Sequence, residues 1–219
     1  MDYESVRILY ESRKTLLKIL AGRGYNVKPY ERFGPVEVEV MAGAGPTSMR
    51  MDLERGPQEG VDQKGISKCV VLYSLNRIKN SLNTFMNGLT DPESEAAIDP
   101  ATTEVVVMLL NDKIVDAFNT AALQAYSAHG LRIGFFQVHQ LVNNPLEHVL
   151  VPKHEKMEEG EHDGFLKAHQ IKSKGNLPTI KFHEDMIARV MGLVPGDVVR
   201  IYRPSPTAGE SVYYRICKP

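Results

Sequence analysis

The sequence predicts an α+β protein of two domains, an N-terminal α/β domain over residues 1–145 and a small C-terminal α+β domain over residues 146–219. Strand-like and helix-like segments alternate between residues 69 and 138, which is typical of an α/β layered unit. Two prolines and several polar residues interrupt this alternation at 143–155. The charge balance also changes there, from 15 basic and 17 acidic residues before the boundary to 11 basic and 10 acidic residues after it.

The composition is that of an ordinary globular protein. Of the 219 residues, 42% are hydrophobic and 24% are charged, and the formal net charge is −1. General electrostatic attraction to nucleic acid is therefore not expected, although local basic patches remain open. No signal peptide is expected, and no apolar run approaches the ~18 residues of a membrane span, so no membrane partner is expected. Cys69 and Cys217 lie far apart, which favours buried thiols in a reducing compartment.

The N-terminal domain begins with an amphipathic helix. Apolar residues recur at helical spacing from Val6 to Leu20, and Gly22 and Gly24 end the pattern. The alternation of Val and Glu at 37–40 then predicts a short strand, and the glycine-rich residues 41–49 predict a loop.

Alternating strands and helices fill the rest of this domain. Runs of apolar and β-branched residues predict buried strands, and apolar residues at helical spacing predict helices. The strands are expected at 69–75, 104–110 and 131–138, the helices at 78–86 and 114–126, and an acidic, proline-punctuated connection at 90–102.

The C-terminal domain reads as a small α+β unit ending in an antiparallel hairpin. The expected elements are a helix at 155–171 weakened by two glycines, a strand at 176–182, a short helix capped by Asp185 and ended by Gly192, a turn at 195–196, and strands at 197–203 and 211–216. Between the last two strands, two prolines, a glycine and small hydroxyl residues predict a stiff polar loop. At roughly 75 residues the domain is near the lower size for independent folding, so docking onto a larger partner would help it.

Four separated motifs in the C-terminal domain carry a family resemblance. "LVPKHE", "LPTI", "ARVMGLVPGDVVRIYRPSPTAG" and "YYRI" occur in this order within residues 150–217. Together they resemble the assembly domain of the shared fifth subunit of eukaryotic DNA-directed RNA polymerases I, II and III, a domain similar to a small subunit of archaeal RNA polymerase. The N-terminal domain resembles the eukaryotic version through an RKT and an RGY triplet, residues 13–15 and 23–25, with weaker matches at 49–53 and 104–111.

The chain departs from the family pattern at a few positions. The family usually has SET where this chain has Ser205-Pro206-Thr207, and commonly has Arg where Glu210 stands. A DP pair becomes Asp185-Met186, and residues 111–113 replace an expected TPSA tip after a buried strand. These differences suggest a divergent lineage or a specialised polymerase.

The resemblance implies a non-catalytic subunit with no cofactor, no metal and no catalytic residue. Its N-terminal domain would form part of the lower jaw near downstream DNA, with a fold similar to restriction-type endonucleases. Its C-terminal domain would anchor to the largest subunit. The implied partners are the largest and other polymerase subunits, transcription factors, and downstream duplex DNA bound without regard to sequence. The implied location is the nucleus, or the virion or host cell if the chain comes from a large DNA virus.

The expected binding residues follow from the motifs. The subunit interface is predicted to contain residues of the polar loop and of the elements beside it: Arg189, Arg203, Pro204, Ser205, Thr207, Ala208, Gly209, Tyr214 and Arg215. The prolines would reduce the entropy lost on docking, and the arginines would bind a carboxylate or a phosphate. Lys113 and Arg203 are predicted to contact DNA through phosphates, because a polymerase must translocate over any template.

Several alternatives stay open or are disfavoured by the residues. Arg13 and Lys14 are interpreted as the exposed face of the first helix, with a DNA or partner contact as the alternative. Four histidines between His148 and His169 lack the spacing of a metal site. The strands at 69–75 and 104–110 lack the E-x-K pair that a nuclease of the restriction type needs, which disfavours a Mg²⁺-dependent nuclease. A stand-alone transcription-regulatory adaptor is a second alternative, of a different class.

Overall fold

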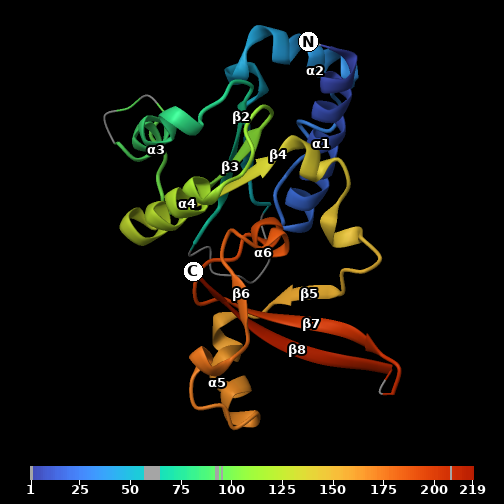
Figure 1. Ribbon diagram of the computed structural model, residues 1–219, viewed down its shortest axis with the longest axis vertical. Coiled ribbons are helices and arrows are strands. Elements are labelled where there is room, and N and C mark those ends of the chain that lie inside the picture. Colours follow the sequence, from blue (N-terminus) through green and yellow to red (C-terminus); the bar gives the residue numbers. More distant parts are fainter. Residues whose placement is uncertain (1, 57–64, 92–93, 95, 208) are drawn as a thin grey trace. The chain divides into compact units, whose positions relative to one another are not determined.

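The computed structural model describes residues 2–56, 65–91, 94, 96–207 and 209–219 (Figure 1). The chain forms two compact units, residues 1–144 and 145–219. Each unit contains one four-stranded sheet and helices, which confirms the predicted α+β class. Among the described residues, the helices are too short or too polar to cross a lipid bilayer.

The first unit is built on a mixed sheet in the order β1-β2-β3-β4. The strands are β1 (Met51–Glu54), β2 (Lys68–Ser74), β3 (Thr103–Leu109) and β4 (Arg132–Gln137). β1 is antiparallel to β2, while β2, β3 and β4 are parallel to one another. All seven residues of β3 are buried, as its unbroken apolar run predicted.

Helices accompany this sheet, largely where they were predicted. They are α1 (Tyr3–Gly22), α3 (Leu82–Thr90) and α4 (Asp116–His129). The expected helix at 78–86 is wrong in its start, because Ile78 and Lys79 donate their backbone N–H groups to the Asp112 carboxylate. A short 3₁₀ turn therefore precedes α3. Short 3₁₀ helices lie in both units, at Pro46–Met49, Lys79–Ser81, Val138–Leu141, Pro145–Glu147 and Lys174–Asn176.

The strand expected at 37–40 is wrong, because these residues belong to helix α2 (Pro35–Ala44). Pro35 occupies the first turn, where its missing N–H costs nothing. The Glu37 carboxylate accepts a 3.0 Å hydrogen bond from the Gly34 N–H, which caps the helix start. Val38 and Ala42, four residues apart, form the buried face. Four alternating residues are compatible with the period of a strand or of a helix. Here the capping interaction at Gly34 and Glu37 stabilises the helix.

The RGY triplet forms a polar centre between the end of α1 and the sheet. Arg23 Nη2 donates a 2.5 Å hydrogen bond to the Glu104 carboxylate on β3, and both side chains are largely buried. Burial alone would lower the pKa of Arg23, but the facing carboxylate and its neighbours outweigh that effect and the net shift is upward. Gly24 adopts a φ of 90°, which favours glycine, and Tyr25 pairs with Arg55 beside β1.

The second unit has a sheet in the order β5-β7-β8-β6. Its strands are β5 (Lys153–Lys156), β6 (Thr179–Lys181), β7 (Val198–Ser205) and β8 (Gly209–Lys218). β7 and β8 form the predicted antiparallel hairpin, and β6 runs parallel to β8. β5 was not predicted; its residues fell partly within the expected helix at 155–171.

Two helices complete the second unit. Helix α5 (Glu159–Ala168) begins four residues later than the sequence predicted, because residues 153–156 pair with β7. Helix α6 (Met186–Met191) starts as predicted, with Asp185 Oδ1 accepting hydrogen bonds from the N–H groups of Ile187 and Ala188. Gly192 ends it in the left-handed conformation, at a φ of 65°.

A small apolar core joins the helix α5 to the base of the hairpin. Its buried members come from loops, a helix and both hairpin strands: Met157, Phe165, Leu177, Val198 and Ile216. Cys217 follows Ile216 on β8 and is also buried, as Cys69 is in the first unit. Burial raises the pKa of the Cys217 thiol to about 12, so it stays protonated and acts as a small apolar side chain.

Candidate functional site

The predicted polar loop between the last two strands is mostly strand. β7 and β8 remain paired as far as Ser205 opposite Gly209, and Arg203 and Pro204 face Ser211 and Glu210. The loop prediction is therefore wrong for Pro204, Ser205, Gly209 and Glu210, whereas Arg203 and Ser211 lie in strands as predicted. The cause is the pairing itself, because β8 supplies partners that the polar composition does not reveal. Pro204 is tolerated since β5 pairs with β7 only as far as Tyr202, which leaves the outer part of β7 at the edge of the sheet.

The hairpin divides into a buried base and an exposed outer half. Val198, Val199 and Ile201 are buried on β7, and Ile216 and Cys217 on β8. From Tyr202 outward to the tip and back to Tyr213, no described side chain is buried. In Figure 1 the hairpin extends beyond the other elements of the second unit.

The outer half of the hairpin carries apolar side chains that are exposed to solvent. Val212 and Tyr213 are exposed, Tyr213 to 51%. Tyr214 instead packs on Phe165, with ring centroids 4.2 Å apart, and against His169. The two neighbouring tyrosines therefore lie on opposite sides of the strand, Tyr214 against the small core and Tyr213 in solvent. A paired arm that leaves apolar side chains in water is typical of a surface that binds a protein partner.

The tip gathers several of the predicted interface residues. Gly209 has a φ of 70°, which favours glycine at the turn. The Ser205 and Thr207 hydroxyls lie 3.3 Å apart, and Thr207 is exposed. The Arg203 side chain is exposed and makes no ion pair with the described residues. Ala208 lies outside the described residues.

The remaining predicted interface residues lie elsewhere or have structural contacts. Arg215 donates a 3.0 Å hydrogen bond to the Thr179 carbonyl, which ties β8 to β6. Arg189 is half-buried on α6, where its Nη2 lies 3.4 Å from the Met186 sulfur. Burial lowers the pKa of Arg189 to about 10, although Asp185 opposes that shift. The structure therefore brings together the tip residues but not Arg189.

Two exposed apolar residues were missed by the sequence analysis. Val149 and Leu150 are 92% and 82% exposed, in the turn that precedes β5. Leu146 is also exposed in the same segment. The signal was present in the sequence, because apolar residues beside Pro152 follow neither a helical nor a strand period. Such exposure of adjacent large apolar side chains indicates a second part of a docking surface.

A basic cluster lies at one edge of the first unit's sheet, where the parallel strands end. Lys113 follows β3, while Arg77 and Lys79 follow β2, and all three side chains are exposed. Asp112 holds the two loops together, because its carboxylate accepts the Lys79 N–H at 3.3 Å beside Lys113. Asn111 adds a 2.6 Å hydrogen bond to the Leu75 carbonyl. The residues that replace the expected TPSA tip thus connect the loops after β2 and β3 through hydrogen bonds.

The acidic residues near this sheet have structural partners. The Glu104 carboxylate binds Arg23, and the Asp112 carboxylate binds two backbone N–H groups. The described part of the chain contains no group of three or more His, Cys, Asp or Glu side chains suited to holding a metal ion. The arrangement suits binding by exposed cations and apolar side chains.

Comparison with known proteins places similarity over nearly the whole chain. Residues 143–217 match the family described as RNA polymerase Rpb5, C-terminal domain. The chain is 30% identical to the DNA-directed RNA polymerases I, II, and III subunit rpabc1 of Dictyostelium discoideum, over 98% of this chain and 99% of that protein. It is 51% identical to the DNA-directed RNA polymerase subunit Rpo5 of Methanosarcina barkeri, over 32% of this chain and 88% of that protein. The subunit Rpo5 of Archaeoglobus fulgidus is 50% identical over a similar share, 32% and 90%.

Proposed function

The chain belongs to the RNA polymerase Rpb5 family, and from this membership we propose how the subunit is held in the polymerase and where it meets DNA. It is a subunit of a multi-subunit DNA-directed RNA polymerase and is not itself catalytic. The family membership that the sequence motifs predicted is thereby confirmed. Its partners include other polymerase subunits, and its relationship to a eukaryotic subunit implies a nuclear location.

The proposed docking surface comprises the outer half of the β7–β8 hairpin and the exposed segment at Leu146, Val149 and Leu150. The observation that carries this proposal is the exposure of these apolar side chains in water. Burial against a partner would stabilise the complex by about 1.5–3 kcal/mol for each large side chain removed from water. We assign the largest subunit as the partner. Arg203 and the tip hydroxyls supply polar contacts at the rim of this surface.

Co-purification distinguishes a core subunit from a regulatory adaptor. A tagged copy of the chain is expected to retain the large polymerase chains in stoichiometric amount through a high-salt wash, because apolar contacts resist salt while surface ion pairs do not. Quantitative mass spectrometry of the eluate measures this ratio. Substoichiometric recovery, or loss of the large chains in salt, would favour the adaptor.

The basic edge of the first unit supports a contact with downstream DNA in the polymerase jaw. Lys113 was predicted for this role, and Arg77 and Lys79 join it at the same edge. Exposed, flexible cations bind phosphates without reading bases, which suits an enzyme that moves along any template. Arg203 remains a second candidate, on the other unit.

Replacing Lys113 with glutamate is expected to weaken retention of downstream duplex DNA by the assembled polymerase and to lower its salt dependence. Loss of one phosphate contact reduces the slope of log affinity against log salt by about 0.9. The combined Lys79→Glu and Lys113→Glu change should roughly double that reduction. Lys28→Glu, at another exposed position of the same unit, is the control. Unchanged retention and slope in the double variant would remove this edge from the DNA path.

A further inference from the structure

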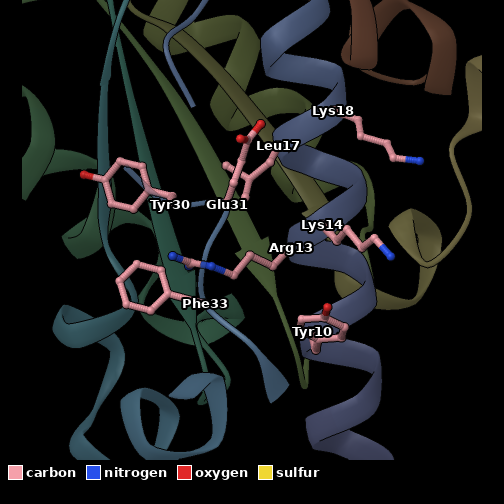
Figure 2. A pocket seen from close by; sticks show the side chains of 8 residues that line it. All are labelled: Tyr10, Arg13, Lys14, Leu17, Lys18, Tyr30, Glu31 and Phe33. Carbon is pink, nitrogen blue, oxygen red and sulfur yellow. The ribbon is translucent and has the colours of Figure 1, made fainter. Parts of the chain in front are cut away.

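Arg13 was expected on the exposed face of the first helix, but its side chain is only 3% exposed. Its neighbour Lys14 is exposed, as expected. The Arg13 side chain leaves α1 and ends between the rings of Tyr30 and Phe33, as Figure 2 shows. The guanidinium carbon lies 5.9 and 5.8 Å from these two ring centroids and 6.0 Å from that of Tyr73.

The guanidinium is poorly satisfied for a buried charge. Its Nη1 donates one long hydrogen bond, 3.4 Å, to the Met49 carbonyl, and its Nε has no hydrogen-bond partner among the described residues. No carboxylate of the described part of the chain forms an ion pair with it. Cation–π contacts near 6 Å stabilise it only weakly. Burying a positive charge without a neighbouring anion costs free energy. The arrangement therefore favours binding of an anion from another molecule.

A cavity of about 250 Å³ opens beside this guanidinium. One wall is α1, which contributes Tyr10, Leu17 and the basic residues. Tyr30 and Phe33 line the cavity on the other side, so its surface is mainly apolar and aromatic with a cation in its wall. This combination of apolar lining and a single fixed polar group is typical of sites that bind a small group specifically.

The charges around the cavity favour an anion. Lys14 and Lys18 also line it, although their side chains extend from α1 in the direction opposite to Arg13 (Figure 2). They therefore attract an anion at longer range and do not clamp it. Among the described residues that line the cavity, Glu31 is the acidic one, and its carboxylate points away from the guanidinium.

We propose that this cavity binds an acidic side chain, flanked by an apolar residue, from a partner polypeptide. The carboxylate pairs with the Arg13 guanidinium, and the apolar neighbour packs on the aromatic wall. Phe33 is 37% exposed, and in the proposed complex its ring turns aside so that the carboxylate reaches Nε. Val36 and Val40, exposed and one helical turn apart on α2, follow Phe33 closely along the chain and are available for further apolar contacts.

A polypeptide fits better than nucleic acid. The phosphates of a duplex lie on a convex backbone and do not reach a guanidinium that is recessed between two rings. A carboxylate at the end of a flexible side chain does reach it. The apolar surface of Phe33, Val36 and Val40 also has no counterpart on a phosphate backbone. The proposal concerns the first unit alone and does not depend on the docking surface or the basic edge proposed above.

The test titrates the full-length free chain with acetyl-Leu-Glu-Leu-amide and follows the Arg13 Nε–H resonance by nuclear magnetic resonance. The glutamate peptide is expected to shift this resonance, and its glutamine counterpart should bind roughly tenfold to a hundredfold more weakly, the usual difference for a hydrogen bond to a charged group. Inorganic phosphate and a short DNA duplex are run in parallel. A shift with either of these but not with the peptide overturns the proposal in favour of a phosphate site, and no shift at all also overturns it.

Surface variants keep the test decisive even if Arg13→Met fails to fold. Glu31→Gln removes the negative charge of a lining residue and is expected to tighten binding of the glutamate peptide about twofold to fivefold, the range of an exposed charge interaction. Lys14→Glu should weaken binding by a similar factor and lower its salt dependence. Lys172→Glu, a charge reversal at an exposed position of the second unit, is the control and should change nothing. Equal affinities across these variants contradict the proposal.

Discussion

Replacing Glu104 with alanine is expected to lower the free energy of unfolding of the first unit by about 3–5 kcal/mol, because Arg23 would be left as an unpaired buried charge. The pair is largely buried, so water does not compensate the lost partner. Since whole domains are stable by only about 5–15 kcal/mol, the variant should be partly unfolded at physiological temperature. Urea denaturation followed by far-ultraviolet circular dichroism measures the change.

Two further variants separate the ion pair from a simple loss of packing. The combined Arg23→Met and Glu104→Met change replaces both charges with apolar groups and should recover most of the stability, since buried pairs contribute little net energy over an apolar substitute. Glu39→Ala, at an exposed position of α2, is the control. A loss below about 1 kcal/mol for Glu104→Ala would show that the pair behaves as an exposed one.

The sequence predicted secondary structure correctly where one kind of interaction determines the conformation of a segment. The buried strands β2, β3 and β4 were predicted because uninterrupted apolar runs have one stable place in a layered fold, between other layers. The short helix α6 was predicted from its two ends, because Asp185 and Gly192 act on the backbone next to them. These signals are local and can be read without knowledge of the partners.

The sequence-based predictions are wrong where contacts between distant segments determine the local structure. Residues 153–156 are polar and form β5 only because the inner half of β7 offers a free edge. Residues 204 and 205 look like a loop and extend β7 because β8 lies opposite. Arg13 looks like a surface residue of an amphipathic helix, yet aromatic side chains from the loop after α1 and from β2 surround it. The spacing of apolar residues along the sequence gives no information about such contacts.

The residues of the candidate site also fall into those that the sequence predicted and those that only the fold brings together. The hairpin tip and Lys113 were predicted from motifs, and the structure leaves Arg203, Thr207 and Lys113 exposed. Arg77 and Lys79 were missed, because their approach to Lys113 follows from the register of β2 and β3 and from the Asp112 contacts. The grouping of side chains at a sheet edge is a property of the fold.

Changing Val149 and Leu150 together to aspartate is expected to release the chain from the polymerase without unfolding it. Both side chains are already exposed in the free chain, so its own stability should change by less than about 0.5 kcal/mol. In the complex, the loss of two buried apolar side chains at about 1.5–3 kcal/mol each weakens association by roughly a hundredfold to ten-thousandfold. Co-purification of the large chains with the tagged variant, alongside thermal unfolding of the free variant, measures both effects.

The control for this prediction is Tyr3→Asp, because Tyr3 is an equally exposed apolar residue of the first unit, outside the proposed surface. It should leave co-purification intact, whereas an Arg203→Glu change at the rim should weaken association by about tenfold or less. The comparison matters because exposed apolar residues are common on protein surfaces and one alone indicates no interface. If the Val149 and Leu150 variant retains the large chains through the same salt wash as the control, the segment is an ordinary exposed turn and the hairpin alone must account for docking.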